Sequence, residues 1–403
     1  MISYSEAEKI LQNEFKKLTL KTEQVDLINS INRIFAEDIF SDINLPPFDN
    51  SAMDGFAIKF NPEIKKWKII GEIPAGKFFD YKMNDYSAVS IMTGGKIPSG
   101  CDTVIPVEDI DIEKDDYIKL KVDAKFVRGL NVRKQGEDLI KGNIALQKNI
   151  LLKPHHIAAA AACGKSTLKV YRKLRIGVMA TGDELVDIHE TPKEDKIRCS
   201  NLYSLLSAIK EINMHPVNLG ITKDIKGLIR DRMKLALEND LDVLITTGGV
   251  SVGKFDYLKE IYEDLGIDIK FYRVKIKPGK PLLFGTLKKK DKTVLIFGLP
   301  GNPVSCLVNF DLFIRQNIYR MFQLDISQKF VANLKEDLYK EDRKRHFLRG
   351  SYYSGIDGKY YVKKVGSQSS GNVSEMGRAN CLIIIEEERI NPKKGEQVEC
   401  IVL

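Results

Sequence analysis

The stretch DVLITTGGVSVGKFDYLKEIYEDLG, Asp242 to Gly266, decides the fold. It opens with an apolar run, passes through a turn rich in glycine, and continues into a segment whose apolar residues recur with helical spacing. Such a strand, turn and helix is the repeating unit of a parallel sheet flanked by helices. The apolar runs LRIGVMAT, VNLGIT and VLIFGL alternate with helical patterns in the same way. Residues 173–328 are therefore predicted to form an α/β domain with a parallel sheet.

Two other regions are predicted to be rich in strands. Residues 45–141 carry short apolar runs, such as KWKIIGEI and YIKLKV, separated by Gly, Pro, Asn and Asp. Residues 329–403 return to the same texture with FLRGSYYS, CLIIIEEE and QVECIVL. Short strands between turn residues are typical of β domains, so one is expected on each side of the α/β domain.

A discontinuous linking domain is expected from residues 1–44 together with 142–172. In the first segment the apolar positions, Ile10 to Leu18 and then Val25 to Ile34, have helical spacing and predict two short helices. The second segment, LLKPHHIAAAAACG, predicts a helix that starts near a proline and stops at a glycine. The predicted fold class is thus multidomain α/β plus β.

Composition points to a multidomain enzyme that does not bind nucleic acid. The chain has 403 residues, more than one hydrophobic core usually supports. Its net charge of +8 comes from 63 basic and 55 acidic residues, so it favours anionic ligands only mildly. The densest basic run, Lys288 to Lys290, falls in a segment that is typical of a hairpin tip.

No membrane segment or export signal is indicated. The N-terminus lacks a basic region followed by an apolar stretch, and the longest apolar run, Ile157 to Cys163, is too short to cross a bilayer. The six cysteines lie far apart, without the paired spacing of zinc or redox sites. We therefore expect a cytoplasmic protein with reduced, mostly buried thiols.

Polar residues follow each predicted parallel strand. In an open α/β sheet, ligands bind outside the carboxyl ends of the strands. These ends read ATGDEL, GITKD, TTGGVSVGKFD and GLPGNP. Gly248, Gly249 and Ser251 could let backbone N–H groups approach a phosphate, although an isolated Gly-Gly pair fits a tight turn better than a phosphate site. Four such strand ends together favour the phosphate site.

Acidic residues at the same strand ends suggest a cation. Carboxylates beside a phosphate would repel it unless a hard cation lies between them, and Mg²⁺ is commonly held by one or two carboxylates and water. Glu184, Asp224 and Asp256 are the candidate ligands. Each precedes a helical pattern, so helix capping is the alternative for any one of them.

A group of lysines follows further along the chain. VKIKPGKPLLFG places Lys275, Lys277 and Lys280 around a Pro-Gly turn. Ammonium groups gathered at one turn can bind a multivalent oxyanion, although solvated surface lysines would give the same pattern.

The string LPPFDNSAMDGFAI, Leu45 to Ile58, strongly resembles the molybdopterin molybdenumtransferases, or molybdenum insertases, the family of bacterial MoeA and the enzymatic end domain of gephyrin. The resemblance continues in family order over essentially the whole chain, through IMTGGKIPSGCDTVIPVED, NVRKQGEDL, MATGDEL, TTGGVSVGKFDY, IKPGKPLLFG, GLPGNPVS and GSQSSGN. Phe56, where the family often has Tyr, is the visible departure.

The resemblance implies a reaction and an assembly. The expected substrates are adenylylated molybdopterin and molybdate, the products are molybdenum-charged molybdopterin and AMP, and Mg²⁺ is the expected cofactor. A homodimer is expected, with each active site between the α/β domain of one subunit and the β domain of its partner. The family fold has four subdomains, the first discontinuous and the last small and β-barrel-like.

The resemblance also assigns roles by matching position. The residues that correspond to the family's catalytic cleft are Asp54, Thr93, Asp138, Glu184, Asp224 and Asp256. Those expected to hold the pterin and phosphates are Gly248, Gly249, Ser251, Lys277, Lys280, Pro300, Gly301, Asn302 and Pro303. Those expected to contact molybdate are Pro281, Arg349, Ser367 and Ser370.

Two other functions are considered. One is the preceding adenylyltransferase step, whose proteins resemble the α/β region alone, so the N-terminal motifs argue against it. The other is a scaffold that binds the pterin or a partner without chemistry, but it would be expected to lose the acidic residues, which are present here. The sequence does not distinguish molybdate from tungstate, and it does not identify the enzymes that receive the cofactor.

Overall fold

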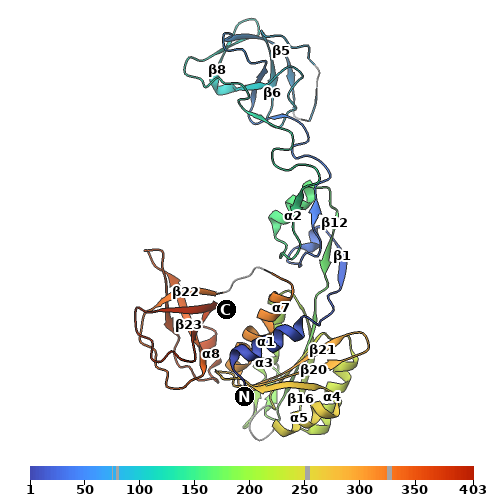
Figure 1. Cartoon of the computed structure of the whole chain (residues 1–403), viewed down its shortest axis with the longest axis vertical. Coiled ribbons are helices and arrows are strands. Elements are labelled where there is room, and N and C mark those ends of the chain that lie inside the picture. Colours follow the sequence, from blue (N-terminus) through green and yellow to red (C-terminus); the bar gives the residue numbers. More distant parts are fainter. Residues whose placement is uncertain (75, 79–80, 250–254, 325–328) are drawn as a thin grey trace.

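Figure 1 shows the computed structural model of the chain, which describes residues 1–74, 76–78, 81–249, 255–324 and 329–403. The molecule is elongated. The β domain lies at one end and the narrow linking domain follows it. The α/β domain and the C-terminal domain lie beside each other at the other end, where a strand of one pairs with a strand of the other.

The α/β domain is built on a six-stranded sheet in the order β16-β13-β17-β21-β20-β18. The first four of these strands run parallel, which confirms the prediction. β20 and β18 join antiparallel at one edge, because β20 and β21 form a hairpin. The strands are β13 (Arg175–Thr181), β16 (His215–Thr222), β17 (Val243–Thr247), β18 (Asp268–Arg273), β20 (Pro281–Lys288) and β21 (Thr293–Leu299). A parallel ladder also joins two short strands, β14 (Leu185–Val186) and β15 (Ile197–Arg198).

Helices cover both faces of this sheet, as its buried strands require. Ile176 and Val178 of β13 face one hydrophobic cluster, whereas Met179 faces the other. This alternation follows from the two-residue period of a strand. One face is covered by α4 (Lys226–Glu238) and α5 (Phe255–Asp264). The other is covered by α3 (Ser200–Glu211), α6 (Pro303–Asn309), a π-helical segment η3 (Phe310–Arg315), α7 (Gln316–Met321) and α1 (Tyr4–Phe15).

Helix α1 begins at a capping box. The Ser3 hydroxyl accepts from the Glu6 backbone N–H at 3.1 Å, and the Glu6 carboxylate accepts from the Ser3 N–H at 2.7 Å. Such reciprocal bonds satisfy donors that a helix start leaves open. The apolar side of α1, including Tyr4 and Leu11, packs into the α/β core. The first segment of the chain thus adds a helix to the α/β domain.

The prediction of a second helix from Val25 to Ile34 is wrong. Thr22–Asp26 forms strand β1, which pairs antiparallel with β12 (Thr167–Tyr171), and Ile28–Ser30 forms one 3₁₀ turn, η1. The strand pairing satisfies the backbone donors and acceptors that a helix would have satisfied internally. Asn32 has a φ of 59°, which a helix cannot contain.

The rest of the linking domain contains one helix and a second short ladder. Helix α2 (Pro154–Ala162) has a proline in its first turn and Gly164, with a φ of 71°, beyond its end, as predicted. It packs with Phe35, Val170 and other apolar residues of this region. The ladder joins β2 (Ile39–Phe40) to β11 (Ile144–Leu146), where the chain leaves for the β domain and returns.

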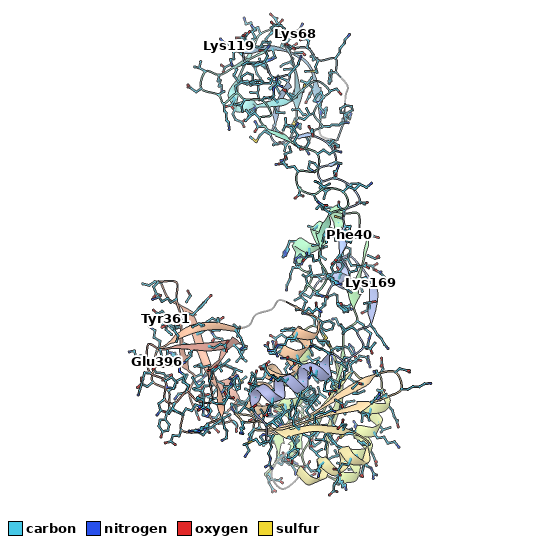
Figure 2. The ribbon with its side chains drawn as sticks, viewed as in Figure 1. Phe40, Lys68, Lys119, Lys169, Tyr361 and Glu396 are labelled. Atoms are coloured by element: carbon cyan, nitrogen blue, oxygen red, sulfur yellow. The ribbon has the colours of Figure 1, made fainter. Side chains whose placement is uncertain are left out.

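The β domain is a six-stranded sheet in the order β7-β4-β6-β5-β9-β8 around two apolar clusters. The strands are β4 (Gly55–Ile58), β5 (Lys66–Ile73), β6 (Ser87–Ile91), β7 (Thr103–Pro106), β8 (Ile110–Glu113) and β9 (Tyr117–Leu120); η2 (Val107–Asp109) precedes β8, and β3 (Asn50–Ser51) pairs with β10 (Val132–Arg133). In Figure 2, Lys68 and Lys119 mark the tip of this domain, far from Tyr361 and Glu396, with Phe40 and Lys169 between.

The C-terminal domain is a closed five-stranded barrel, which confirms the barrel-like prediction. The ring runs β23-β24-β22-β26-β25 and closes because β25 also pairs with β23. Closure removes the open edges that a sheet of this size would otherwise expose. Its elements are β22 (Lys329–Leu334), β23 (Arg345–Ser354), β24 (Tyr360–Lys364), α8 (Val373–Met376), β25 (Cys381–Ile385) and β26 (Gln397–Val402). The strand β19 (Ile276–Lys277) joins the barrel to the α/β domain by pairing with β23.

Five of the six cysteines are buried, in agreement with the prediction. Among the helices of the described residues, none has the length and apolar character needed to cross a bilayer.

Candidate functional site

A cleft of about 680 Å³ opens at the carboxyl ends of the parallel strands. We call it the strand-end cleft. Thr181 at the end of β13 and Thr247 at the end of β17 lie in its wall, as expected for an open α/β sheet. The residues that line it are Thr181, Glu184, Leu185, Ile197, Arg198, Cys199, Ser200, Asn201, Asp224, Thr247, Gly248, Gly249, Pro281, Pro300, Gly301, Asn302, Pro303, Gly371 and Val373. All four strand ends singled out in the sequence therefore contribute residues to one cavity.

The glycine pair in this wall needs its glycines for two separate reasons. Gly248 and Gly249 have φ values of 92° and 70°, which other residues rarely adopt. A Cβ at Gly248 would also lie 2.2 Å from the carbonyl oxygen of Thr181. The tight-turn interpretation is thus correct for both residues, and the same turn brings their backbone to the surface of the cleft. Ser251 lies outside the described residues.

Two of the candidate metal ligands, Glu184 and Asp224, line the cleft. The Glu184 carboxylate lies against Gly182, where a Cβ would come within 2.7 Å of Oε2. The Asp224 backbone N–H donates to the Asp183 carboxylate at 3.0 Å. Glu184 precedes the short strand β14, so it is not the helix cap considered as its alternative. The side chain of Asp256 lies outside the described residues.

The loop Pro300–Pro303 is tied to the C-terminal domain. The Asn302 side-chain amide donates to the Ser370 hydroxyl at 3.1 Å, and the Val304 N–H donates to the Ser370 carbonyl at 3.3 Å. Residues of both loops line the cleft, so its far wall depends on this junction between two domains.

Arg349 stabilises the loop that forms the C-terminal side of this junction. Its side chain is buried, and its guanidinium donates to the carbonyls of Ser367, Ser369 and Asn372 at 2.6, 2.9 and 2.9 Å. These bonds fix the loop that carries Ser370. The predicted contact of Arg349, Ser367 and Ser370 with molybdate stays a prediction; the geometry gives Arg349 a role in holding the loop.

The lysine group lies beside the cleft. Pro281 lines the cavity, whereas Lys277 and Lys280 are exposed and are absent from its wall as the described residues define it. Lys277 belongs to β19 and pairs with His346 of the barrel strand β23. The expected contact of both lysines with substrate therefore stays a prediction.

The other candidate residues lie in or next to the β domain. Asp54, just before β4, accepts from both the backbone N–H and the hydroxyl of Thr93, each at 2.7 Å. Both bonds lower the pKa of the Asp54 carboxyl below its ordinary value, and the bond from the backbone N–H has the larger effect. Asp138 is exposed, and its N–H donates to the Leu45 carbonyl. Asp54 is thus held as an exposed carboxylate.

The two sets of residues lie in different parts of one chain. Asp54 and Thr93 flank strands β4 and β6 of the β domain, whereas Glu184 and Asp224 follow strands of the α/β domain. Figure 1 shows the linking domain between them. Within a single chain these residues do not meet.

Arg198 and Asn201 are among the residues of the cleft wall that the sequence reasoning missed. They lie at the end of β15 and in the first turn of α3. From the sequence alone, Asn201 belongs only to the helical pattern after the apolar run LRIGVMAT, and Arg198 has no assigned role. The available signal was position, because a helix that follows the first parallel strand starts near the carboxyl ends of the sheet.

Comparison with known families divides the chain into three matched regions. Residues 2–164 match the model of the MoeA N-terminal region (domain I and II), residues 177–320 match that of a probable molybdopterin binding domain, and residues 331–403 match that of the MoeA C-terminal region (domain IV). Together they span most of the chain in family order.

Individual relatives agree. The molybdopterin molybdenumtransferase of Haemophilus influenzae is 36% identical over 94% of this chain and 93% of its own length. That of Bacillus subtilis is 33% identical over 95% and 90%. The crystal structure of the molybdopterin biosynthesis MoeA protein of Pyrococcus horikoshii OT3 superposes over 100% of both chains with a TM-score of 0.83 and 27% identity. The chain therefore belongs to the MoeA family of molybdopterin molybdenumtransferases.

Proposed function

We propose that this chain transfers molybdenum from molybdate to adenylylated molybdopterin and releases AMP. One observation carries the proposal: the strand-end cleft gathers a glycine turn, two acids and the Pro300–Pro303 loop in a chain that matches the family over nearly its whole length. The N-terminal region, matched at residues 2–164, argues against the adenylyltransferase alternative, and the retained acids argue against a scaffold without chemistry.

We further propose that the active unit is a homodimer. In the proposed arrangement the β domain of one subunit faces the strand-end cleft of the other, so that Asp54 and Thr93 complete a site with the partner's cleft. The separation of the two acidic sets within one chain supports this. Association with the adenylyltransferase that supplies the substrate, and with enzymes that accept the cofactor, is part of the same proposal.

The cleft has donors suited to Mg²⁺. Mg²⁺ is usually bound by one or two carboxylates, with water and substrate phosphates completing its shell. Glu184 and Asp224 both line the cleft and would hold the ion, with Asp256 as the third candidate. Among the described residues no cluster of three or more potential metal-ligating side chains occurs, so substrate and water would supply the remaining ligands. The bound ion would offset the phosphate charge as AMP leaves.

The protein's own groups would position the reactants. The backbone at Gly248 and Gly249 and the Pro300–Pro303 loop would bind the nucleotide-activated pterin. Asp54, kept ionised by its two bonds from Thr93, would accept a hydrogen bond from the water or hydroxyl group that attacks. Such a hydrogen bond would lower the activation barrier for release of AMP only if Asp54 reaches the cleft of the partner subunit.

The decisive experiment is molybdate-dependent release of AMP by the purified protein supplied with adenylylated molybdopterin. We expect release with molybdate and none without it. Asp54→Asn should still bind substrate but release AMP at least about a hundredfold more slowly, a usual effect of removing one preorganised group. Activity of wild-type protein on molybdopterin and ATP without molybdate would instead support the adenylyltransferase. Substrate binding without any AMP release would support the scaffold.

A further inference from the structure

Among the described residues that line it, the strand-end cleft carries more acidic than basic side chains. Of these described residues, Glu184 and Asp224 carry negative side chains and Arg198 carries the single positive one. A substrate with phosphates would meet two carboxylates there. A cationic side chain in the same wall would offset that repulsion, and Arg is the residue best suited to phosphate because its guanidinium can donate two parallel hydrogen bonds.

Arg198 is held in place by the short β14–β15 ladder. Arg198 is paired with Val186, and the ladder is anchored by the Ile197 N–H donating to the Glu184 carbonyl at 2.8 Å. The ladder thus places Arg198 beside the segment that carries the Glu184 carboxylate. This backbone pairing makes the position of Arg198 in the cleft wall a property of the fold.

The guanidinium of Arg198 is oriented but not neutralised. Its Nε donates to the carbonyl of Glu190 at 3.0 Å, which fixes the plane of the group. No carboxylate of the described residues lies within ion-pair distance of it, although most arginines of the chain have such a partner. The side chain is exposed to the cleft. Its two terminal nitrogens are therefore able to donate to a bound anion.

A second polar group next to Arg198 also lacks a partner. Asn201, in the first turn of α3, is 7% exposed and lines the cleft. Its Nδ2 donates to the Gly301 carbonyl at 2.7 Å, whereas its buried Oδ1 has no hydrogen-bond partner among the described residues. Buried polar atoms are nearly always paired. An open acceptor beside an open cation points to a ligand that brings both a donor and an anion.

We propose that Arg198 is a substrate-binding residue that contacts the phosphate oxygens of an adenine nucleotide in the strand-end cleft, next to the open acceptor of Asn201. The ligand class is a nucleoside 5′-diphosphate or its pterin-linked equivalent. This inference rests on the proposed function for the identity of the substrate, but the charge and geometry of the subsite do not depend on the reaction.

The test compares Arg198→Gln and Arg198→Lys with Lys193→Gln in the full-length protein. Lys193 is an exposed cation between β14 and β15 that does not line the cleft, so it controls for net charge. Calorimetric titration with ADP and with adenosine separates phosphate binding from nucleoside binding. For Arg198→Gln we expect the Kd for ADP and the KM for adenylylated molybdopterin to rise about tenfold or more, the scale of a lost charge-assisted bond.

Arg198→Lys should recover part of the loss, adenosine binding should change in neither Arg198 variant, and Lys193→Gln should match wild type. Unchanged ADP affinity and unchanged KM in a folded Arg198→Gln protein, or equal losses in Lys193→Gln, would overturn the inference. If wild-type protein releases no AMP while ADP binding still depends on Arg198, the proposed function fails and the phosphate subsite stands.

Discussion

At Gly182 the backbone lies so close to the Glu184 carboxylate that a Cβ would fall 2.7 Å from Oε2 and 2.8 Å from Oε1. The obstacle is the end of a flexible side chain, so Gly182→Ala should displace the carboxylate and leave the fold intact. We expect the rate of AMP release to fall about a hundredfold, which a shift of about 1 Å at a reacting group can cause. Thermal unfolding should change by only a few degrees. Steady-state kinetics and calorimetry measure the two effects.

Gly227→Ala is the matched control for this substitution. Gly227 lies in the first turn of α4, and a Cβ there meets nothing within 4 Å. Alanine should stabilise the protein by up to about 1 kcal/mol and leave AMP release unchanged. Equal kinetics in the Gly182 and Gly227 variants would show that the position of Glu184 does not matter to the reaction.

The contact between Thr93 and Asp54 predicts a pH effect. Thr93→Val removes the hydroxyl donor but keeps the backbone N–H, so the pKa of Asp54 should rise towards its ordinary value. If catalysis needs the ionised carboxylate, the acid limb of the rate profile should move to higher pH. Because the pKa of Asp54 is lower in the folded protein, the contact stabilises the fold at pH values above the ordinary pKa of an Asp carboxyl. This contribution is lost as pH falls through the pKa that Asp54 has in the folded protein.

Thr93→Ser keeps the hydroxyl and should retain the wild-type acid limb. NMR titration of the Asp54 carboxyl carbon gives the pKa independently of the reaction. A raised pKa with an unmoved rate profile would remove the charge of Asp54 from the mechanism.

Most polar residues of the cleft could be predicted from the sequence, but its one basic residue, among those described, could not. Glu184, Asp224, Gly248 and Gly249 could be recognised because they follow apolar strands, and the parallel sheet brings such ends to one edge. Arg198 could not be recognised in this way. It belongs to a two-residue strand whose pairing with β14 depends on tertiary structure.

Among the elements, long runs with a clear period were predictable and short ones were not. The four parallel strands and α2 were predicted because their apolar pattern or end signals are strong. The helix predicted for Val25–Ile34 is wrong because the apolar spacing of this segment fits a helix locally. The hydrogen-bond partners of its first residues are on β12, and they are available only in the folded chain. The placement of α1 on the α/β domain likewise depends on contacts that its sequence does not specify.

The π-helical segment η3 contains an ion pair whose loss should destabilise the protein. Arg315 Nε lies 2.9 Å from Asp311 Oδ1, with 7% and 9% of their side chains exposed. Burial raises the pKa of Asp311 to about 6. Arg315→Met would leave a buried carboxylate without its cation, which typically costs about 3 to 5 kcal/mol. Denaturant unfolding of the variant measures the loss.

The loss should depend on pH. Because the pKa of Asp311 is above its ordinary value, the folded state takes up a proton as pH falls through about 6, and stability gains from this group. Without Arg315 that pKa rises further, so the deficit of Arg315→Met should be large at pH 8 and smaller at pH 5. Glu211→Gln removes a second carboxylate partner of Arg315. The Glu211 side chain is 58% exposed, so this substitution should lower the free energy of unfolding far less than Arg315→Met does. A deficit independent of pH would indicate lost packing instead.

At the scale of the whole molecule, the linking domain separates the two acidic sets and gives the chain its length. Among the described residues, the chain reaches the β domain and returns from it beside the β2–β11 ladder, and Asp54 and Thr93 flank strands of a different sheet from the one that ends at the strand-end cleft. Under the proposed function, Asp54 and Thr93 form one half of the site and need a second chain to meet a strand-end cleft. In the proposed symmetric dimer, the β domain of each chain would lie against the other subunit, and two equal sites would form.

This arrangement predicts complementation between inactive subunits. Asp54→Asn damages the β-domain half and Glu184→Gln damages the cleft half, so each homodimer should have two defective sites. In a heterodimer, one site combines both defects and the other combines the intact halves. If subunits exchange at random, half of the dimers are mixed and half of their sites are intact, so the mixture should recover about a quarter of wild-type AMP release. Each variant is purified alone, the two are mixed and allowed to exchange, and AMP release is followed over time. Recovery that rises as exchange proceeds supports a site shared across the dimer, whereas a mixture that stays as inactive as its components would mean that Asp54 and Glu184 act within the same chain or not in one site at all.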